Sequence, residues 1–259
     1  MKLSKIALLF FIVILALNCK NEKSNTEVVT SKKEVTINMS KTNVDVKPIS
    51  HGTLVLEIED QTIYIDPTGG QDAFKDQKKP TLVLITDIHG DHLSIETLEA
   101  LDINEVTLIA PAAVAEKLPN DICETIVTLN NGDSYDFEGV KIEAIPMYNL
   151  REEALKFHPK ERGNGYVITI NEERIYISGD TEDIPEMRNL KNIDKAFVCM
   201  NLPYTMTVES AASAVLDFKP KKVYPYHYRG TEGLSDVEKF KSLVNEGNTS
   251  IEVLLLDWY

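Results

Sequence analysis

Apolar and polar residues alternate through residues 53–65, and this pattern predicts two strands joined by a tight turn. The alternation runs through 53–58, breaks at the polar triplet 59–61 and resumes in TIYID at 62–66. A continuous apolar run follows at 81–86, TLVLIT, which is typical of a strand covered on both faces. The start of the domain is therefore expected to build a sheet.

Short strands and amphipathic segments alternate through the rest of the chain. Four helices are expected, at 94–102, 111–118, 207–217 and 235–245. Further strands are expected at 106–109, 125–128, 134–137, 140–145, 165–170, 173–178, 196–200, 222–226 and 251–256. Because helices follow strand-rich stretches in each half, we expect an α/β fold of four layers, with two sheets packed together and helices outside.

The first residues have the pattern of an export signal. Lys2 and Lys5 precede an unbroken apolar run of 12 residues at 6–17, IALLFFIVILAL. This run is shorter than the roughly 20 residues that span a bilayer and matches the apolar region of a secretory signal. Cys19 follows, so the segment resembles a bacterial lipoprotein signal, in which the cysteine becomes the lipidated first residue. We expect a signal peptide at 1–18 and a membrane-anchored, extracytoplasmic lipoprotein, in the periplasm or on the cell surface; an uncleaved anchor is the alternative.

Composition separates a spacer from a single domain. Residues 19–47 are rich in Lys, Asn, Ser, Thr and Glu and predict a flexible spacer, whereas 48–259 have the uniform texture of one domain. The formal net charge is −14, and removal of residues 1–18, which carry two lysines and no acid, leaves −16. Such acidity argues against a nucleic-acid partner and against charge-driven membrane binding, so the tether has to be the lipid on Cys19.

Two cysteines lie within the expected domain, Cys123 and Cys199. An exported protein could pair them. Cys199 lies in the apolar run AFVCM, which favours a buried structural thiol instead.

Four residues of metal-binding types follow the strand at 81–86 within six positions: Asp87, His89, Asp91 and His92. Residues 87 and 89 are two apart, so an extended backbone directs both side chains to one side. Gly90 permits a tight turn that brings the next two residues toward the same space. Carboxylates and neutral imidazoles bind zinc, manganese and iron, so this loop is a candidate metal site.

Two further residues of the same kind end later strands. Asp180 lies in Ser-Gly-Asp-Thr after the strand at 173–178, and His227 follows the strand at 222–226. Each alone would more often be a helix cap or a structural histidine. Together with the 87–92 loop they point to one centre at the carboxyl edge of the sheets.

This order of motifs resembles the metallo-β-lactamase superfamily. Its H-x-H-x-D-H signature matches residues 87–92, with Asp87 in place of the first histidine. Its bridging aspartate matches Asp180 and its last histidine matches His227, and Asp66 matches an aspartate that supports the metal loop. The resemblance covers 48–259 and implies an αββα sandwich of two mixed sheets. It is nearest to the branch with L-ascorbate-6-phosphate lactonase and N-acyl-phosphatidylethanolamine phospholipase D.

The chain departs from this pattern in its histidines, of which it contains only five. The mid-chain histidine of the superfamily is missing, and Tyr148 and Asn149 stand there instead. His158, ten residues beyond Tyr148, is expected to act as a substitute ligand or a proton donor. His51 is expected to be structural or to support the site from outside it.

The resemblance implies one or two divalent ions, zinc first and manganese or iron as alternatives. One site would use Asp91, His92, His227 and Asp180, and a weaker one Asp87, His89, Asp180 and His158. A metal-bound hydroxide, oriented by Asp91, would hydrolyse an ester, phosphodiester, lactone or amide.

The substrate is expected to be a small molecule or lipid-like, with Arg162, Arg229 or, less favoured, Lys160 holding its phosphate or carboxylate group. The depleted histidines leave an alternative open, a non-catalytic lipid-anchored binding protein with a degenerate metal site. A flavin-linked di-iron relative is less favoured, because the chain carries no flavin-binding segment.

Overall fold

The computed structural model describes residues 44–259, which belong to one compact unit. The expected signal peptide at 1–18, the lipidated Cys19 and the spacer up to residue 43 lie outside the described residues. Within 44–259, none of the helices has the length and apolar character needed to cross a membrane.

The first sheet has six strands in sequence order, and the first three are antiparallel. From the third strand onward they run parallel, which places the loops after them at one edge. The strands are β1 (Val44–Ser50), β2 (Thr53–Ile58), β3 (Gln61–Ile65), β4 (Leu82–Leu84), β5 (Thr107–Ala110) and β6 (Thr125–Thr128). A 3₁₀ turn at Gln71–Phe74 and the helices α1 (Ile95–Ala100) and α2 (Ala112–Ala115) connect the parallel strands.

The second sheet has seven strands in the order β15-β12-β11-β10-β9-β8-β7. These are β7 (Ser134–Phe137), β8 (Val140–Met147), β9 (Gly163–Ile170), β10 (Glu173–Ile177), β11 (Lys195–Val198), β12 (Lys222–Pro225) and β15 (Glu252–Val253). Strands β7 to β10 are antiparallel, and β10, β11, β12 and β15 are parallel. The other elements are α3 (Pro185–Arg188), α4 (Val208–Phe218), α5 (Val237–Gly247), a 3₁₀ turn at Glu152–Ala154 and the hairpin β13 (Arg229–Gly230) and β14 (Gly233–Leu234).

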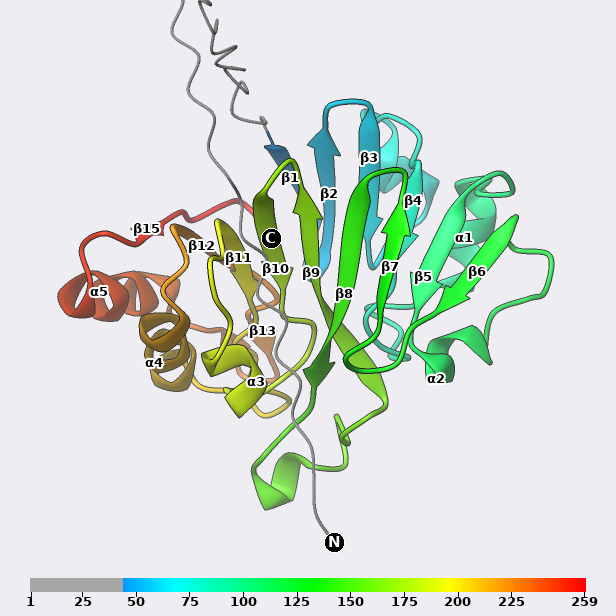
Figure 1. The fold of residues 1–259 in the computed structure, drawn as a ribbon. Coiled ribbons are helices and arrows are strands. Elements are labelled where there is room, and N and C mark those ends of the chain that lie inside the picture. Colours follow the sequence, from blue (N-terminus) through cyan, green and yellow to red (C-terminus); the bar gives the residue numbers. More distant parts are fainter. Residues whose placement is uncertain (1–43) are drawn as a thin grey trace, which may run out of the picture. The chain divides into compact units, whose positions relative to one another are not determined.

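The two sheets pack together with helices on their outer faces, as Figure 1 shows, with α1 and α2 on one side and α3 to α5 on the other. Alternate residues of β2 separate the layers. Leu54 and Leu56 belong to the core shared by the two sheets, whereas Val55 packs in the core under α1 and α2. This arrangement confirms the predicted four-layer α/β fold.

One local difference from the sequence prediction has a physical cause. Strand β1 begins at Val44, inside the predicted spacer, because Val44 and Val46 pair with Ile58 and Leu56 of β2. Val44 is the only buried residue of this edge strand and the others are half-buried or exposed, so its sequence lacks a strong apolar pattern. In the described part of the chain the cysteines are buried and unpaired, as the favoured alternative predicted.

Candidate metal centre

The expected ligands come from loops that follow parallel strands. The 85–92 loop follows β4, the 178–182 loop follows β10 and residues 226–228 follow β12. Since the carboxyl ends of these strands meet at one edge, the three loops converge there.

The first group comprises His92, Asp180 and His227, whose ligand atoms lie within 4.8 Å of one another. His92 Nε2 is 3.5 Å from Asp180 Oδ2, and His227 Nε2 is 3.4 Å from Oδ2 of Asp91. Donors bound at about 2.1 Å to one tetrahedral ion stand about 3.4 Å apart, so these separations suit a shared cation. We call these four residues the His92 site.

The second group comprises Asp87, His89 and His158, again with ligand atoms within 4.8 Å of one another. His89 Nδ1 lies 2.7 Å from Asp87 Oδ2, and His158 Nε2 lies 3.9 Å from the same oxygen. His158 Nε2 is also 3.3 Å from Asp180 Oδ2, so Asp180 borders both groups. We call Asp87, His89 and His158 the Asp87 site.

His158 reaches the centre because its loop folds back on itself. The N–H of Asn149 donates to the carbonyl of His158, and the Asn149 amide lies 3.2 Å from His158 Nδ1. The ring is buried and directs Nε2 toward the acids. The loop thus brings an imidazole within reach of Asp87 and Asp180.

The donor atoms of the His92 site fit a cation. His92 Nε2, Asp180 Oδ1 and His227 Nε2 are buried and have no hydrogen-bond partner. A buried polar atom without a partner costs about 1–3 kcal/mol, and a coordinated ion removes that cost. Imidazole and carboxylate donors of this kind suit zinc, manganese or iron.

Nearby imidazoles keep the side chains of Asp180 and Asp91 ionised, so both present negative charge to a cation. Burial opposes ionisation of Asp180, but the imidazoles of His227 and His92 outweigh it and hold its pKa well below the usual range. Burial likewise opposes ionisation of Asp91, and the nearby imidazole of His227, with Nε2 3.4 Å from Asp91 Oδ2, is the largest influence that lowers its pKa. Both groups are therefore carboxylates at neutral pH.

In each imidazole of the His92 site, Nδ1 contacts a neighbouring polar side chain. Asp66 Oδ2 lies 2.8 Å from His92 Nδ1, as the superfamily resemblance implied for this acid. The side-chain amide of Asn201 lies 2.9 Å from His227 Nδ1. The Asp66 carboxylate accepts from His92 Nδ1 and so directs Nε2 of that ring toward the site, as in metal-binding histidines. The Asn201 amide, in contrast, donates to His227 Nδ1 and only fixes the position of that ring.

His51 lies beside the site, in a position that suits the supporting role expected for it. Its Nε2 is 3.3 Å from Asp91 Oδ2, and its Nδ1 is 2.8 Å from the hydroxyl of Tyr259. The turn between β1 and β2 brings it there, with His51 at φ 56° and Gly52 against the ring of His227. No local pattern in the sequence signals this contact, because it joins segments 40 positions apart.

Two expectations about the loops change. Arg162 does not point to a substrate; its guanidinium binds both oxygens of Asp87, at 3.1 and 2.9 Å. Gly90 has no positive φ, and a side chain added there would meet nothing within 4 Å, so the metal loop does not depend on glycine at this position.

A cavity of about 320 Å³ opens at the site. Its walls combine ligand residues of both sites with Phe157, Asn201 and Tyr204. The rings of Phe157 and Tyr204 meet edge to face with centroids 5.1 Å apart. The opening is therefore polar at the metal end and aromatic on the side of the loops.

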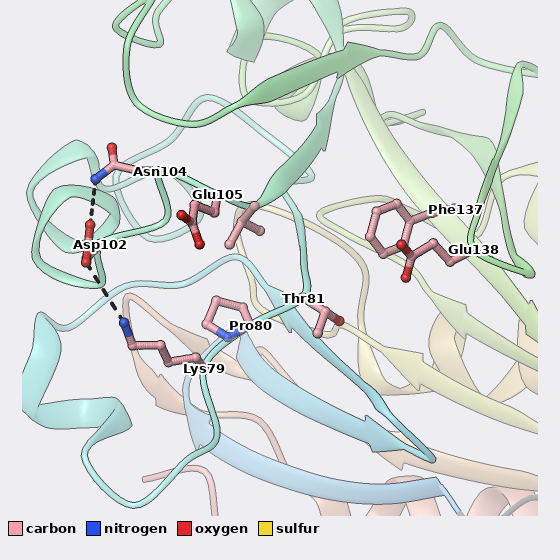
Figure 2. Close-up of a pocket in the computed structure, with 9 residues that line it drawn as sticks. Lys79, Pro80, Thr81, Asp102, Asn104, Glu105, Phe137 and Glu138 are labelled. Carbon is pink, nitrogen blue, oxygen red and sulfur yellow. Dashed lines mark hydrogen bonds and ion pairs between the residues drawn. The ribbon is translucent and has the colours of Figure 1, made fainter.

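A larger cavity, of about 550 Å³, lies at the opposite ends of β4 and β5 (Figure 2). Its polar side chains pair with one another, since Asp102 accepts from the Asn104 amide and lies 3.9 Å from Lys79 Nζ. It contains no histidine or cysteine, so the chemistry is expected at the smaller cavity.

Comparisons with known proteins show the family to which the chain is related. Residues 61–228 match the model of the beta-lactamase superfamily domain. A metal-dependent hydrolase of Pyrococcus horikoshii is 31% identical over 230 residues, covering 82% of this chain and 96% of that protein. A crystal structure from Parabacteroides distasonis, described as a metal-dependent hydrolase, is 37% identical with a TM-score of 0.76, covering 85% of this chain and 96% of that one. A metallo hydrolase of Ignicoccus hospitalis shares the fold, with a TM-score of 0.71 at 22% identity, covering 84% and 96% of the two chains.

Proposed function

This chain belongs to the metallo-β-lactamase superfamily and is a metal-dependent hydrolase, and we propose that it cleaves an ester, phosphodiester, lactone or amide at the His92 and Asp87 sites. The observation that carries the proposal is the set of buried, unpartnered donor atoms on His92, Asp180 and His227. Zinc is the proposed ion, with manganese or iron as alternatives, because the donors are mixed imidazole and carboxylate.

A divalent ion held by these residues supplies an acidified water, whose pKa falls toward about 7. Asp91, half exposed to the cavity, is positioned to orient that water by accepting its hydrogen bond. Tyr259 Oη accepts the N–H groups of Tyr228 and Arg229, so its own proton goes to His51 Nδ1. His51 then carries its proton on Nε2, and this N–H donates a hydrogen bond to Asp91. The bond fixes the direction of the Asp91 carboxylate.

His158 has two possible roles in this scheme, and its position favours the ligand role. Its Nε2 is directed at the carboxylates of Asp180 and Asp87 rather than at open space. As a ligand it completes the Asp87 site. As a proton donor to the leaving group it would need a substrate atom between it and these acids.

We further propose a substrate with an apolar portion, because the large apolar side chains exposed within 44–259 lie on or beside chain segments that line the cavity. Leu150 and Leu155 lie on the loop that carries His158, and Leu202 adjoins Asn201 in the cavity wall. Leu234 lies on the hairpin that is bonded to residue 202 through the N–H of Thr231. Their exposed fractions are 42–55%, so burial of these side chains against an apolar part of a substrate would be favourable.

Chain-length dependence tests this substrate class. Each methylene that leaves water contributes about 0.8 kcal/mol, or about four-fold in kcat/KM. Esters with decanoyl groups should therefore be cleaved faster than acetyl esters. Leu155→Ser and Leu202→Ser should reduce that preference and leave acetyl ester cleavage unchanged. Equal rates for the two chain lengths would contradict an apolar substrate.

The lipid tether on Cys19, in the periplasm or on the cell surface, is proposed from the sequence at 1–19. A lipid-like substrate would suit this location. The test is fractionation of cells that produce the chain and the Cys19→Ser variant. We expect the first in the membrane fraction and the second released; an unchanged distribution would favour an uncleaved anchor.

Metal analysis together with a substrate panel tests the hydrolase itself. Asp180→Ala and His227→Ala should lose bound metal and turnover. Asp194→Ala, which removes a carboxylate paired with Lys221 away from the site, should keep both. Retention of metal and activity by the first two variants would refute the site assignment. Metal binding without turnover on ester, lactone, phosphodiester and amide substrates would favour a non-catalytic binding protein.

A further inference from the structure

We infer that Arg162 is a positioning residue that makes the two cation sites unequal, so that the His92 site fills first and the Asp87 site only when the guanidinium yields. This inference deepens the proposed function and rests on it.

The contact between Arg162 and Asp87 occupies both carboxylate oxygens. Nε lies 3.1 Å from Oδ1 and Nη2 lies 2.9 Å from Oδ2, the two-pronged geometry in which arginine binds carboxylates most strongly. The Asp87 side chain is fully buried and that of Arg162 is only 18% exposed. Water therefore screens this ion pair little.

The surrounding backbone holds the arginine in this place. The N–H of Asn164 donates to the carbonyl of Thr86, which joins the start of β9 to the metal loop directly. Gly163, between Arg162 and Asn164 in the chain, lies so close to the metal loop that an added Cβ would be 3.0 Å from the Thr86 carbonyl oxygen. Arg162 Nη2 also donates to the carbonyl of Phe157, on the loop that carries His158. The guanidinium therefore links Asp87 to that loop.

The two sites differ in what their donors already bind. In the His92 site, His92 Nε2, Asp180 Oδ1 and His227 Nε2 have no hydrogen-bond partner. In the Asp87 site, the carboxylate is shared with a permanent positive charge. A second cation would have to compete with the guanidinium for the same oxygens and would be repelled by it.

The consequence is a sequential filling of the centre. The first ion enters the His92 site without displacing any protein group. The second ion requires Arg162 to leave Asp87, which also frees the contact to residue 157 and so the loop beside His158 and the cavity. Occupancy of the second site is thereby coupled to the position of this loop.

Calorimetric titration of metal-stripped full-length protein with Zn²⁺, supported by elemental analysis and by the absorption spectrum of the Co²⁺ form, tests the inference. The unmodified chain should bind one ion tightly and a second at least about 10-fold more weakly. Arg162→Gln should tighten the second step by about 10-fold or more and leave the first unchanged. Arg151→Gln is the matched control, since Arg151 ties the same loop to Glu182 without touching Asp87; it should change neither step.

Asp87→Asn provides a second variant if Arg162→Gln does not fold. It should leave the first step unchanged and weaken the second further. Three results would overturn this inference but not the proposed function. They are two equal steps in the unmodified chain, an unchanged second step in Arg162→Gln, and a weakened first step in Asp87→Asn. Failure of the unmodified chain to bind any divalent ion would instead refute the proposed function.

Discussion

The carboxylate of Asp66 lies 2.8 Å from Nδ1 of His92, and neither side chain is exposed to solvent. Thr86 fixes the acid by donating its backbone N–H to Oδ1 and its hydroxyl to Oδ2. The buried carboxylate of Asp66 therefore binds Nδ1 of His92 and leaves Nε2 as the nitrogen that faces the cation site.

Asp66→Asn should weaken metal binding by about 10–100-fold, since a supporting acid of this kind both orients the imidazole and increases its basicity. Thr86→Val removes only one of the bonds that fix the acid and should have a smaller effect. Calorimetric titration of the stripped proteins with Zn²⁺ measures both. An affinity unchanged in Asp66→Asn would show that His92 is oriented by other contacts.

His51→Asn should lower kcat by about 100-fold without loss of bound metal, because His51 orients Asp91 but lies outside the His92 site. Asparagine tolerates the positive φ of this position, so the turn should be retained. Tyr259→Phe removes the hydroxyl that faces His51 Nδ1 and should shift kcat in the same direction by less. Loss of metal from His51→Asn would identify His51 as a ligand instead.

Gly52→Ala should impair metal binding, because the added Cβ would lie 2.6 Å from Cδ2 of His227 and displace the ring. Overpacking of this kind costs about 1–3 kcal/mol in stability. Gly90→Ala is the comparison in the metal loop, where an added Cβ meets nothing within 4 Å. Thermal unfolding and metal content should change only in the first variant, and equal effects in both would exclude the contact with His227 as the cause.

Cys199 should resist alkylation in the native protein at pH 8. Burial raises the pKa of its thiol to about 12, so almost none of the reactive thiolate is present and the reagent has no access. Above that pH the thiolate would form, but below it the thiol persists. Peptide mapping after iodoacetamide treatment should find residue 199 modified only when denaturant is present, and rapid native labelling would show that this part of the core opens.

The sequence was sufficient to predict the elements that carry the ligands. Strand β4 is a continuous apolar run, and Asp180 and His227 directly follow apolar strands, so local pattern alone located them at strand ends. Parallel pairing then brings these ends together. The four-layer arrangement followed from the order of strands and helices for the same reason.

The contacts that refine the site were not predictable in this way. Arg162 and Asp87 are 75 positions apart, and their contact depends on the register between β9 and the metal loop. Basic residues near a motif are compatible with substrate binding or with an internal ion pair, and composition does not distinguish the two. The folded loop that carries His158 could be proposed from its spacing, but its direction depends on Asn149 and on the chain at Tyr204.

The contact between His51 and Tyr259 joins residues 208 positions apart, and His51 in turn contacts Asp91 of the His92 site. Every proposed metal ligand lies between these two residues in the chain. This contact forms only when the hairpin of β1 and β2 and the segment after β15 have both folded against the rest of the domain, which requires synthesis through residue 259. Capture of a cation by the finished pocket is consequently expected only after residues 51 to 259 have been synthesised and have folded together.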